Sequence, residues 1–516
     1  MKKKVVFSLL LVLVLAFGII SCDRSASVGQ AGGEVIRIGL DVDAAGPIDP
    51  RVSRNTTQMR VIEQIFDGLI DLDENLQPIP VLAERWENPD PLTWIFHLRR
   101  GVRFHNGAEF TSRDVKKTYE DIMDPAFNYQ LRASFLAISN INADDPYVVI
   151  FQLSEPFAPL LPHMTIGIVP WDAAEPEVFG NAPVGTGPYV FREWIRNSRI
   201  VVDTNPNYFW GPPATRTIEF YIIPDNSTRV AALEAGDVDI IHSPLSPSDI
   251  NRLRTNRNFN IFETPGLGVT FLNFNWNSGL ITDPIIRRGL SHLIDKETIS
   301  RDIYMGMDIP AISTLLPVSW AFDPNTINYE FNPSMADAAF REAGFTRGAD
   351  GFYARGGQRL SITVATHTED PNRVQTVEFL QNVFTNNGVD TEVVTMEWPS
   401  FDAYISSGRY EIALVGLVNI IDPDRYLHSR FHTTGGANYG GHGTPRLDQL
   451  INDARRVSDL NERARFYHEA ANIISGEVMH NVLLYQRYVA ISNVSIQGFA
   501  PQATGSFRSL PRTTIR

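Results

Sequence analysis

The stretch that decides the fold is Val269–Ile294, VTFLNFNWNSGLITDPIIRRGLSHLI, in which the period of the apolar residues changes. Up to Trp276 the side chains alternate with a period of two, which is typical of a strand. Asp283 is a candidate N-cap, Pro284 suits the first helical position, and the apolar residues that follow share one helical face: Ile286, Leu290, Leu293 and Ile294. We expect this strand-to-helix passage to be a crossing between two lobes.

Length and charge limit the class of protein. A chain of 516 residues exceeds what one core usually supports, so two or more domains are expected. Its 43% hydrophobic and 20% charged content is typical of a globular protein. The net charge of −14 argues against a nucleic-acid partner, because a binder needs a basic face to neutralise phosphates.

The N-terminus has the composition of an export signal. Three lysines precede an apolar run, Val5–Ile20, which is too short for a membrane span, and Cys22, the only cysteine, follows it. This pattern predicts a lipoprotein signal peptide at residues 1–22 that ends at lipidated Cys22, and a flexible tether at residues 23–33. The alternative is a signal peptide cut elsewhere, with Cys22 there by chance. We expect a lipid-anchored protein on the periplasmic or extracellular face of a bacterial membrane.

The rest of the chain alternates strand and helix patterns. A first strand is predicted at Val35–Leu40, and a loop leading into a helix at Asn55–Leu72. In the second half, a strand, a helix and a strand follow one another at Leu360–Thr366, Arg373–Asn386 and Val389–Thr395. That order is typical of a crossover unit, so the predicted fold class is α/β.

Five segments carry a family resemblance, and they begin at Leu76, Pro183, Ala232, Phe271 and Tyr410. They read LQPIPVLAERWENPDPLTWIFHLRRGVRFHNGAEFTSRDV, PVGTGPYVFREW with NPNYFWG, ALEAGDVDII, FLNFNWNSGLITDPIIRRGLSHLIDKETI and YEIALVGLVNIIDPDRYL. In sequence and order they resemble the oligopeptide/dipeptide-binding family of ABC-importer substrate-binding proteins, the bacterial extracellular solute-binding proteins of family 5.

The resemblance implies a two-lobed, periplasmic-binding-protein-like fold. Lobe I would comprise residues 34–268, with an extra subdomain at about 73–183, and lobe II residues 269–482. Residues 483–516 would return to lobe I, with a second crossing near Val482–Ile491. A monomer of this kind captures a peptide or another small solute between its lobes, without a cofactor, and delivers it to the permease subunits of an ABC importer.

The resemblance also implies the ligand contacts. Peptide-binding members hold the ligand backbone against loops like Asn55, Thr56 and Thr57 on one lobe and a segment like Val415–Pro423 on the other. The second segment contains four candidates: Gly416, Leu417, Asn419 and Asp422. Where the family has tryptophan and then an aspartate for the peptide's α-ammonium, this chain has Leu417 and Asn419.

That departure leaves several interpretations open. Either Asp422 or another acid binds the ammonium, or the ligand is not a free-amine peptide, because a buried cation without a partner costs about 3–5 kcal/mol. Oligosaccharides and other neutral solutes are the alternative ligands, since amides and aromatic rings suit hydroxyls. Asn419 could also serve only a loop turn.

Other candidate binding residues are less specific. Arg373 lies near where dipeptide-binding relatives place an arginine for the ligand carboxylate, although a first-turn arginine is commonly a solvated one. Trp398 and Trp276 are either pocket aromatics or core residues.

An enzyme is the rival class, and the motifs argue against it. The chain has no G-x-S-x-G elbow or phosphate loop, and His468-Glu469-Ala470-Ala471-Asn472 lacks the second histidine of a zinc-protease motif. His428 and His432 lack a clear third ligand, so no metal site is predicted. A receptor that signals to a chemosensor is a further alternative. We predict a binding protein and not an enzyme.

Overall fold

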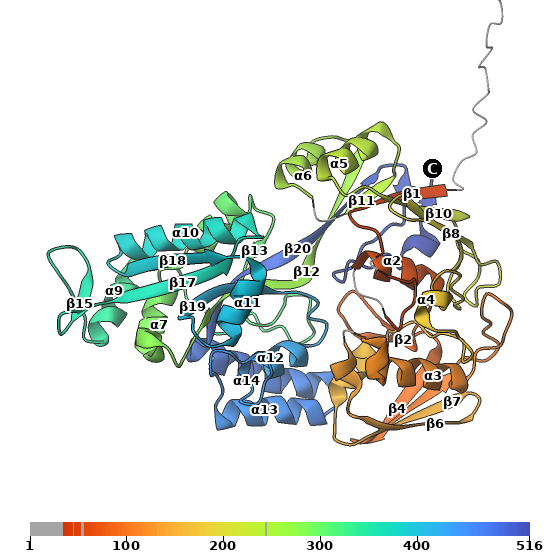
Figure 1. The fold of residues 1–516 in the computed structure, drawn as a ribbon, viewed down its shortest axis with the longest axis horizontal. Helices are drawn as coiled ribbons and strands as arrows, with labels where there is room; N and C mark the ends of the chain where they lie inside the picture. Colours follow the sequence, from red (N-terminus) through yellow and green to blue (C-terminus); the bar gives the residue numbers. More distant parts are fainter. Residues whose placement is uncertain (1–34, 45, 53–55, 130, 243–244) are drawn as a thin grey trace, which may run out of the picture.

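Two lobes are joined by two long strands in the computed structural model, which describes residues 35–44, 46–52, 56–129, 131–242 and 245–516. These strands, β12 (Phe259–Phe274) and β20 (His480–Asn493), run antiparallel and pass between the lobes (Figure 1). They lie in the middle of the main sheet, whose strand order is β18-β17-β19-β12-β20-β11-β1-β10-β9-β8, with β13 (Ile309–Pro310) beside β20. The predicted two-lobed α/β fold is confirmed.

Lobe I, as we use the term, is the part of the molecule built on the strands beyond β20. These are β11 (Ile240–His242), β1 (Val35–Leu40), β10 (Thr217–Ile222), β9 (Arg199–Thr204) and β8 (Tyr189–Ile195). One face packs against α2 (Thr56–Ile65) and the C-terminal segment, and the other against α5 (Asn226–Ala235) and α6 (Pro247–Arg254). The remaining short elements are α4 (Pro176–Phe179), η6 (Leu510–Arg512), β21 (Ile496–Gln497) and β22 (Thr514–Ile515).

A subdomain with its own core extends from lobe I. The hairpin of β2 (Ile70–Leu72) and β3 (Pro78–Pro80) leads into a sheet of β4 (Ala83–Asp90), β5 (Thr93–Leu98), β7 (Val148–Leu153) and β6 (Ile138–Asp145). Helix α3 (Ser112–Met123) packs on this sheet, and Tyr119 meets Phe151 edge to face at 5.1 Å. Three short helices follow it: η1 (Pro125–Phe127), η2 (Arg132–Phe135) and η3 (Ala158–His163).

Lobe II is built on β19 (Ile412–Leu417), β17 (Ser361–His367) and β18 (Asp390–Met396). Helix α10 (Pro371–Asn386) connects the parallel strands β17 and β18, as the strand, helix, strand pattern predicted. The other helices are η4 (Gly279–Thr282), α7 (Pro284–Ser291), α8 (Lys296–Thr298), η5 (Ile299–Ile303), α9 (Pro333–Glu342), α11 (Trp398–Ser406), α12 (Pro423–Phe431), α13 (Pro445–Arg456) and α14 (Leu460–Gly476). A small sheet holds β14 (Thr346–Arg347), β15 (Tyr353–Arg355) and β16 (Gln358–Arg359).

The deciding stretch forms a strand and a helix, with different ends from those expected. Helix α7 begins at Pro284, and the Asp283 side chain accepts a hydrogen bond from the Ile285 amide at 2.9 Å. The helix ends at Ser291, so Leu293 and Ile294 are buried beyond it. Strand β12 begins at Phe259 and not at Val269, because residues from Phe259 onward already pair with β20. The sequence did not predict this part of the strand, since its apolar and polar residues do not alternate.

The ladder between the two crossing strands is irregular at one point. Pro265 is opposite Arg487 and Val269 is opposite Tyr485, so three residues of β12 face Gln486 alone. Pro265 has no amide hydrogen to donate, and a Cβ added to Gly268 would lie 2.0 Å from Oε1 of Gln486. A bulge of this kind disrupts the ladder locally and bends the strand.

The N-terminal predictions fall outside the described residues. These are the signal peptide that ends at Cys22 and the tether at 23–33. Within the part of the chain that the structure describes, no helix has both the length and the apolar character that a membrane crossing requires. Lipid anchoring stays a prediction.

Candidate functional site

The strand directions place a candidate binding region at the crossing. Strand β12 runs from lobe I to lobe II, and β11, β1 and β10 run the same way, because β20 is antiparallel to both β12 and β11. Strands β19, β17 and β18 run in the opposite direction. The carboxyl ends of both parallel groups therefore point toward the crossing. In open α/β sheets, ligands bind at the carboxyl ends of the strands.

Arg373 and Gly416 meet at the carboxyl edge of lobe II. Arg373 lies in the first turn of α10, and Gly416 is near the end of β19. A Cβ added to Gly416 would lie 2.0 Å from Nη2 of Arg373, so the guanidinium rests directly on the glycine backbone. Nε of Arg373 lies 3.2 Å from a carboxylate oxygen of Asp370, the N-cap of α10. Nε has no hydrogen-bond partner among the described residues, so its contact with Asp370 is an ion pair only.

His367, at the end of β17, holds this arginine in place. Nη1 of Arg373 donates to Nε2 of His367 at 2.8 Å, because a guanidinium has no acceptor. The other ring nitrogen, Nδ1, then carries the hydrogen and donates to Glu369 at 3.0 Å. Glu369 also accepts the Trp398 amide at 2.7 Å, and the pKa of its carboxyl is lowered, chiefly by that hydrogen bond.

Trp398 is the first residue of α11 and stands beside the same group. Its ring meets the His367 ring at 5.1 Å and an interplanar angle of 87°. The side chain is 48% exposed, which is unusual for a tryptophan in contact with a core phenylalanine, Phe401. Arg373, Trp398 and Gly416, chosen from the sequence for separate reasons, thus converge on one edge.

The candidate residues in the loop after β19 differ in how far they are exposed. Leu417 is partly buried and packs against the lobe II core, whereas Val418 is 51% exposed. Asn419 is exposed and has a φ of 58°, a left-handed conformation that asparagine tolerates better than most residues. Its carbonyl accepts a hydrogen bond from Arg425 at 2.9 Å. The backbone of Asn419 therefore serves the loop turn, while its side chain stays exposed.

The structure gives Asp422 a structural role instead of the expected ligand contact. Its side chain is fully buried and accepts hydrogen bonds from the two terminal nitrogens of Arg463, at 3.0 and 2.9 Å. It also caps α12 by accepting the Asp424 amide at 2.9 Å. Both oxygens are occupied and shielded, so Asp422 cannot receive a ligand ammonium.

The other candidates are less informative. Asn55 lies outside the described residues, and Thr56 and Thr57 begin α2, with side chains that the structure does not describe. Trp276 lies within lobe II beneath the guanidinium of Arg287, at 4.7 Å, and beside His442. His428 and His432 stack at 4.6 Å, but the described residues hold no group of three or more histidine, cysteine or acidic side chains fit to bind a metal.

A set of charged residues along the crossing strands was not predicted from the sequence. Glu263 of β12 pairs with Arg487 of β20 at 2.5 Å and also with Arg254 of α6. The Arg487 amide lies 3.4 Å from a carboxylate oxygen of Asp308. Burial raises the pKa of the Asp308 carboxyl to about 6. Asp370 and Arg373 also act on the Asp308 charge, so this set continues into the lobe II edge. No local pattern joins residues so far apart in sequence.

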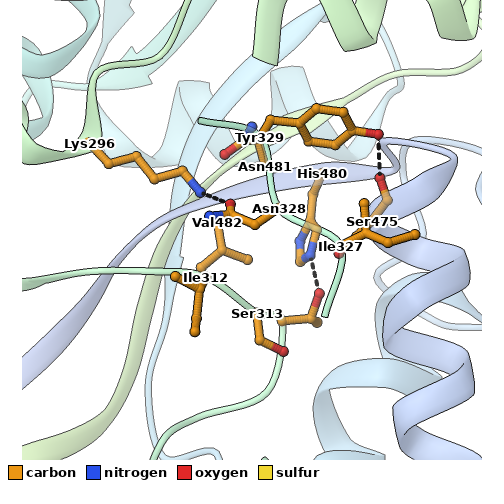
Figure 2. A pocket seen from close by; sticks show the side chains of 11 residues that line it. Lys296, Ile312, Ser313, Ile327, Asn328, Tyr329, Ser475, His480, Asn481 and Val482 are labelled. Carbon is orange, nitrogen blue, oxygen red and sulfur yellow. Dashed lines mark hydrogen bonds between the residues drawn. The ribbon is translucent and has the colours of Figure 1, made fainter. Parts of the chain in front are cut away.

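Two cavities differ greatly in size. The larger, of about 810 Å³, lies in lobe I beside the crossing strand residues Thr264 and Pro265, and Val318 of lobe II borders it. The smaller, of about 20 Å³, lies within lobe II around Lys296, whose side chain donates to Asn328 at 2.9 Å (Figure 2). The same nitrogen reaches the Ala311 carbonyl at 2.8 Å. The smaller cavity has room for about one water molecule and not for a solute.

Comparison with known proteins agrees with this architecture. Residues 77–438 match the middle region of the bacterial extracellular solute-binding proteins, family 5. The chain belongs to this family. As a family 5 protein it is a substrate-binding protein of an ABC transporter and not an enzyme, which confirms both predictions.

Individual relatives of this family 5 protein have low sequence identity to it, but the similarity extends over most of each chain. It is 25% identical over 460 residues to the dipeptide-binding protein of Escherichia coli, covering 83% of this chain and 84% of that one. It is 26% identical over 447 residues to heme-binding protein A of Haemophilus influenzae, with 80% of each chain covered. The solved structure of HbpA2 from Haemophilus parasuis has the same fold, with a TM-score of 0.85 at 22% identity over 94% of this chain and all of that one.

Proposed function

We propose that this protein is a lipid-anchored, extracytoplasmic receptor that captures a carboxylate-bearing solute, such as a peptide, between its lobes for an ABC importer. The supporting observation is the contact of Arg373 with Gly416 at the carboxyl edge of lobe II. The lobe boundary is proposed at residues 266–268, where the β12–β20 ladder changes register. Closure over the solute would then bend the ladder at that point.

Arg373 offers the donor that a carboxylate requires. Nη1 donates to His367, Nε faces Asp370 without forming a hydrogen bond, and Nη2, which rests on Gly416, is the donor that we assign to the ligand. A charge-assisted hydrogen bond of this kind contributes about 1.5–3 kcal/mol. Trp398, half-exposed beside the arginine, supplies an apolar surface for the ligand's neighbouring atoms.

Among the described residues at the carboxyl ends of β17 and β19, no acid is free for an α-ammonium. Asp422 is bound to Arg463, Asn419 is neutral, and Asp370 and Glu369 are already engaged with Arg373, His367 and the Trp398 amide. An ammonium buried there would lack its counter-charge. The proposed ligand is therefore a peptide with a blocked amine, or another solute that carries an acid without a facing amine.

Thermal shift with a ligand panel tests this proposal. The panel holds dipeptides, the same dipeptides N-acetylated, N-acetylated peptide amides that lack the carboxylate, and neutral oligosaccharides. We expect the N-acetylated acids to raise the Tm most, and Arg373→Met to remove that shift. A free dipeptide that exceeds every other compound would contradict the blocked-amine proposal. An oligosaccharide that does so would favour the neutral-solute alternative.

Anchoring through Cys22 is a separate part of the proposal. It is supported by the lysines and the apolar run that precede this single cysteine. We expect the Cys22→Ser chain to leave the membrane fraction and the detergent phase, and the wild type to stay in both. A Cys22→Ser chain that stays with the membrane would contradict lipid attachment.

A further inference from the structure

The large cavity in lobe I is markedly acidic. Five carboxylate side chains line it, from Glu63, Asp67, Asp71, Asp73 and Glu74, against two arginines, Arg508 and Arg512. Tyr208 and Trp210 form part of its wall. This lining differs from the lobe II edge, where Arg373 faces the proposed solute.

Three of these acids share one cation, Arg508, as the positive charge that compensates them. Arg508 pairs with Asp71 at 2.8 Å, and its charge also acts on Glu63 and Asp67. The other partners of Glu63 and Asp67 are neutral: Ser506, the Phe507 amide and Nε2 of Gln64 for Glu63, and Thr186 and Tyr208 for Asp67. When all three acids are ionised, their three negative charges exceed the single positive charge of Arg508 by two.

Burial raises the pKa of both under-compensated acids, to about 7 for Glu63 and about 6 for Asp67. Protonation therefore relieves part of the excess negative charge near neutral pH. A bound cation would relieve it without protonation, because an opposite charge nearby favours the ionised form.

An unpaired acceptor lies at the same cavity. Gln64 follows Glu63 on α2 and is fully buried, and its Oε1 has no hydrogen-bond partner. Its Nε2 is directed to the Phe507 carbonyl at 3.3 Å. A buried acceptor without a donor costs about 1–3 kcal/mol, so its presence at a cavity wall indicates a missing N–H or O–H group.

We propose that this cavity binds an organic cation with N–H donors, an alkylammonium or a guanidinium, whose charge complements Glu63, Asp67 and Asp71 and whose N–H reaches Gln64. The described residues offer no group of acids and histidines fit for a metal ion, which favours an organic cation. The cation comes either from a small free amine or from a basic side chain of a bound peptide. The second source rests on the proposed function, and the first does not.

Agmatine, which carries both groups, is the probe for the full-length protein. At about ten times its dissociation constant we expect it to raise the Tm by about 2 °C beyond sodium chloride of equal ionic strength. Glu63→Gln should weaken binding at least about tenfold in calorimetry, and Gln64→Met by about threefold. Glu155→Gln, at an exposed acid of the subdomain, is the matched control and should bind as the wild type does.

Proton release provides a second readout. At about pH 6.5, agmatine binding should expel about half a proton or more, measured by calorimetry in buffers of different ionisation enthalpy. The groups facing Glu63 and Asp67 are Asp71, Arg508, Tyr208 and Tyr488, so the two acids are the expected source. Glu63→Gln should reduce the release.

Several outcomes would overturn the proposal. These are a shift that sodium chloride reproduces, unchanged affinity in Glu63→Gln, or unchanged affinity in Gln64→Met if Glu63→Gln does not fold. Arg373→Met separates this cavity from the proposed solute site: agmatine affinity should not change, and a loss would place the cation at lobe II instead. Binding of an arginine-containing N-acetylated peptide that is weakened by both Glu63→Gln and Arg373→Met would identify the peptide side chain as the source.

Discussion

The guanidinium of Arg373 rests on the backbone of Gly416, with Nη2 only 2.0 Å from the position that a Cβ would occupy. Two segments more than forty residues apart in sequence therefore form one surface at the end of β17 and β19. That surface needs a residue without a side chain at 416, a requirement that leads to the first prediction.

Gly416→Ala should displace Arg373 and weaken binding of the N-acetylated ligand by about tenfold or more, equivalent to about 1.4 kcal/mol. Calorimetry measures the affinity, and thermal unfolding checks that the fold survives. Gly436→Ala is the control, because a Cβ there meets no atom within 4 Å. Equal affinity in both variants would show that Arg373 does not contact the ligand.

Breaking the buried pair of Asp422 and Arg463 should destabilise lobe II. Arg463→Met leaves the Asp422 carboxylate buried without its partner, at a cost of about 3–5 kcal/mol in the free energy of unfolding. Arg446→Met, in an exposed pair with Glu469, should cost less than about 1 kcal/mol. Urea unfolding measures both. A small loss in Arg463→Met would contradict the structural role of Asp422.

His163 should make the protein sensitive to mild acid. Burial lowers the pKa of its imidazole to about 4, whereas the unfolded chain titrates near its ordinary 6.5. The unfolded state thus binds the proton first, and stability is lost as the pH falls from about 6.5 toward 4. By pH 5 this group costs about 2 kcal/mol.

His163→Gln should remove that part of the acid sensitivity. Urea unfolding at pH 7 and pH 5 gives the difference for the wild type and the variant. His97→Gln, at a partly exposed histidine beside Glu87, is the control. If the variant and the wild type lose equal stability between the two pH values, His163 does not cause the loss.

A contact between the subdomain and lobe II should favour the closed form. The guanidinium of Arg455 in α13 lies 5.0 Å from the ring of Phe157, next to η3, and pairs with Asp424 at 3.2 Å. Phe157→Ala removes a contact that contributes about 1 kcal/mol in the closed form only, so solute affinity should fall about fivefold although no ligand contact changes. The packing that Phe157 loses in the subdomain core lowers the stability of both forms.

Small-angle scattering of the unliganded Phe157→Ala chain should show a larger radius of gyration than the wild type. The control is Arg113→Ala, which removes a similar contact with Trp171 inside the subdomain and cannot affect closure. An unchanged radius together with unchanged affinity would show that this contact does not hold the lobes together.

Local patterns in the sequence were sufficient for many elements of the fold. Asp283 and Pro284 start α7, because such signals act within a few residues. The first half of strand β12 could not be predicted from local patterns. This half pairs with β20, which lies more than two hundred residues later in the sequence. Pro265, Gly266 and Gly268 interrupt the alternation of side chains that is typical of a strand.

By itself, the sequence determined the fold class, the family and the general chemistry, because those follow from periodicity and from motifs carried along the chain. The tertiary structure decided which residues meet. It engaged Asp422 with Arg463, placed Arg373 on Gly416, and gathered Glu63, Asp67 and Asp71 around one arginine. The physical reason is that ion pairing, burial and close approach depend on distances through space, which local sequence patterns do not record.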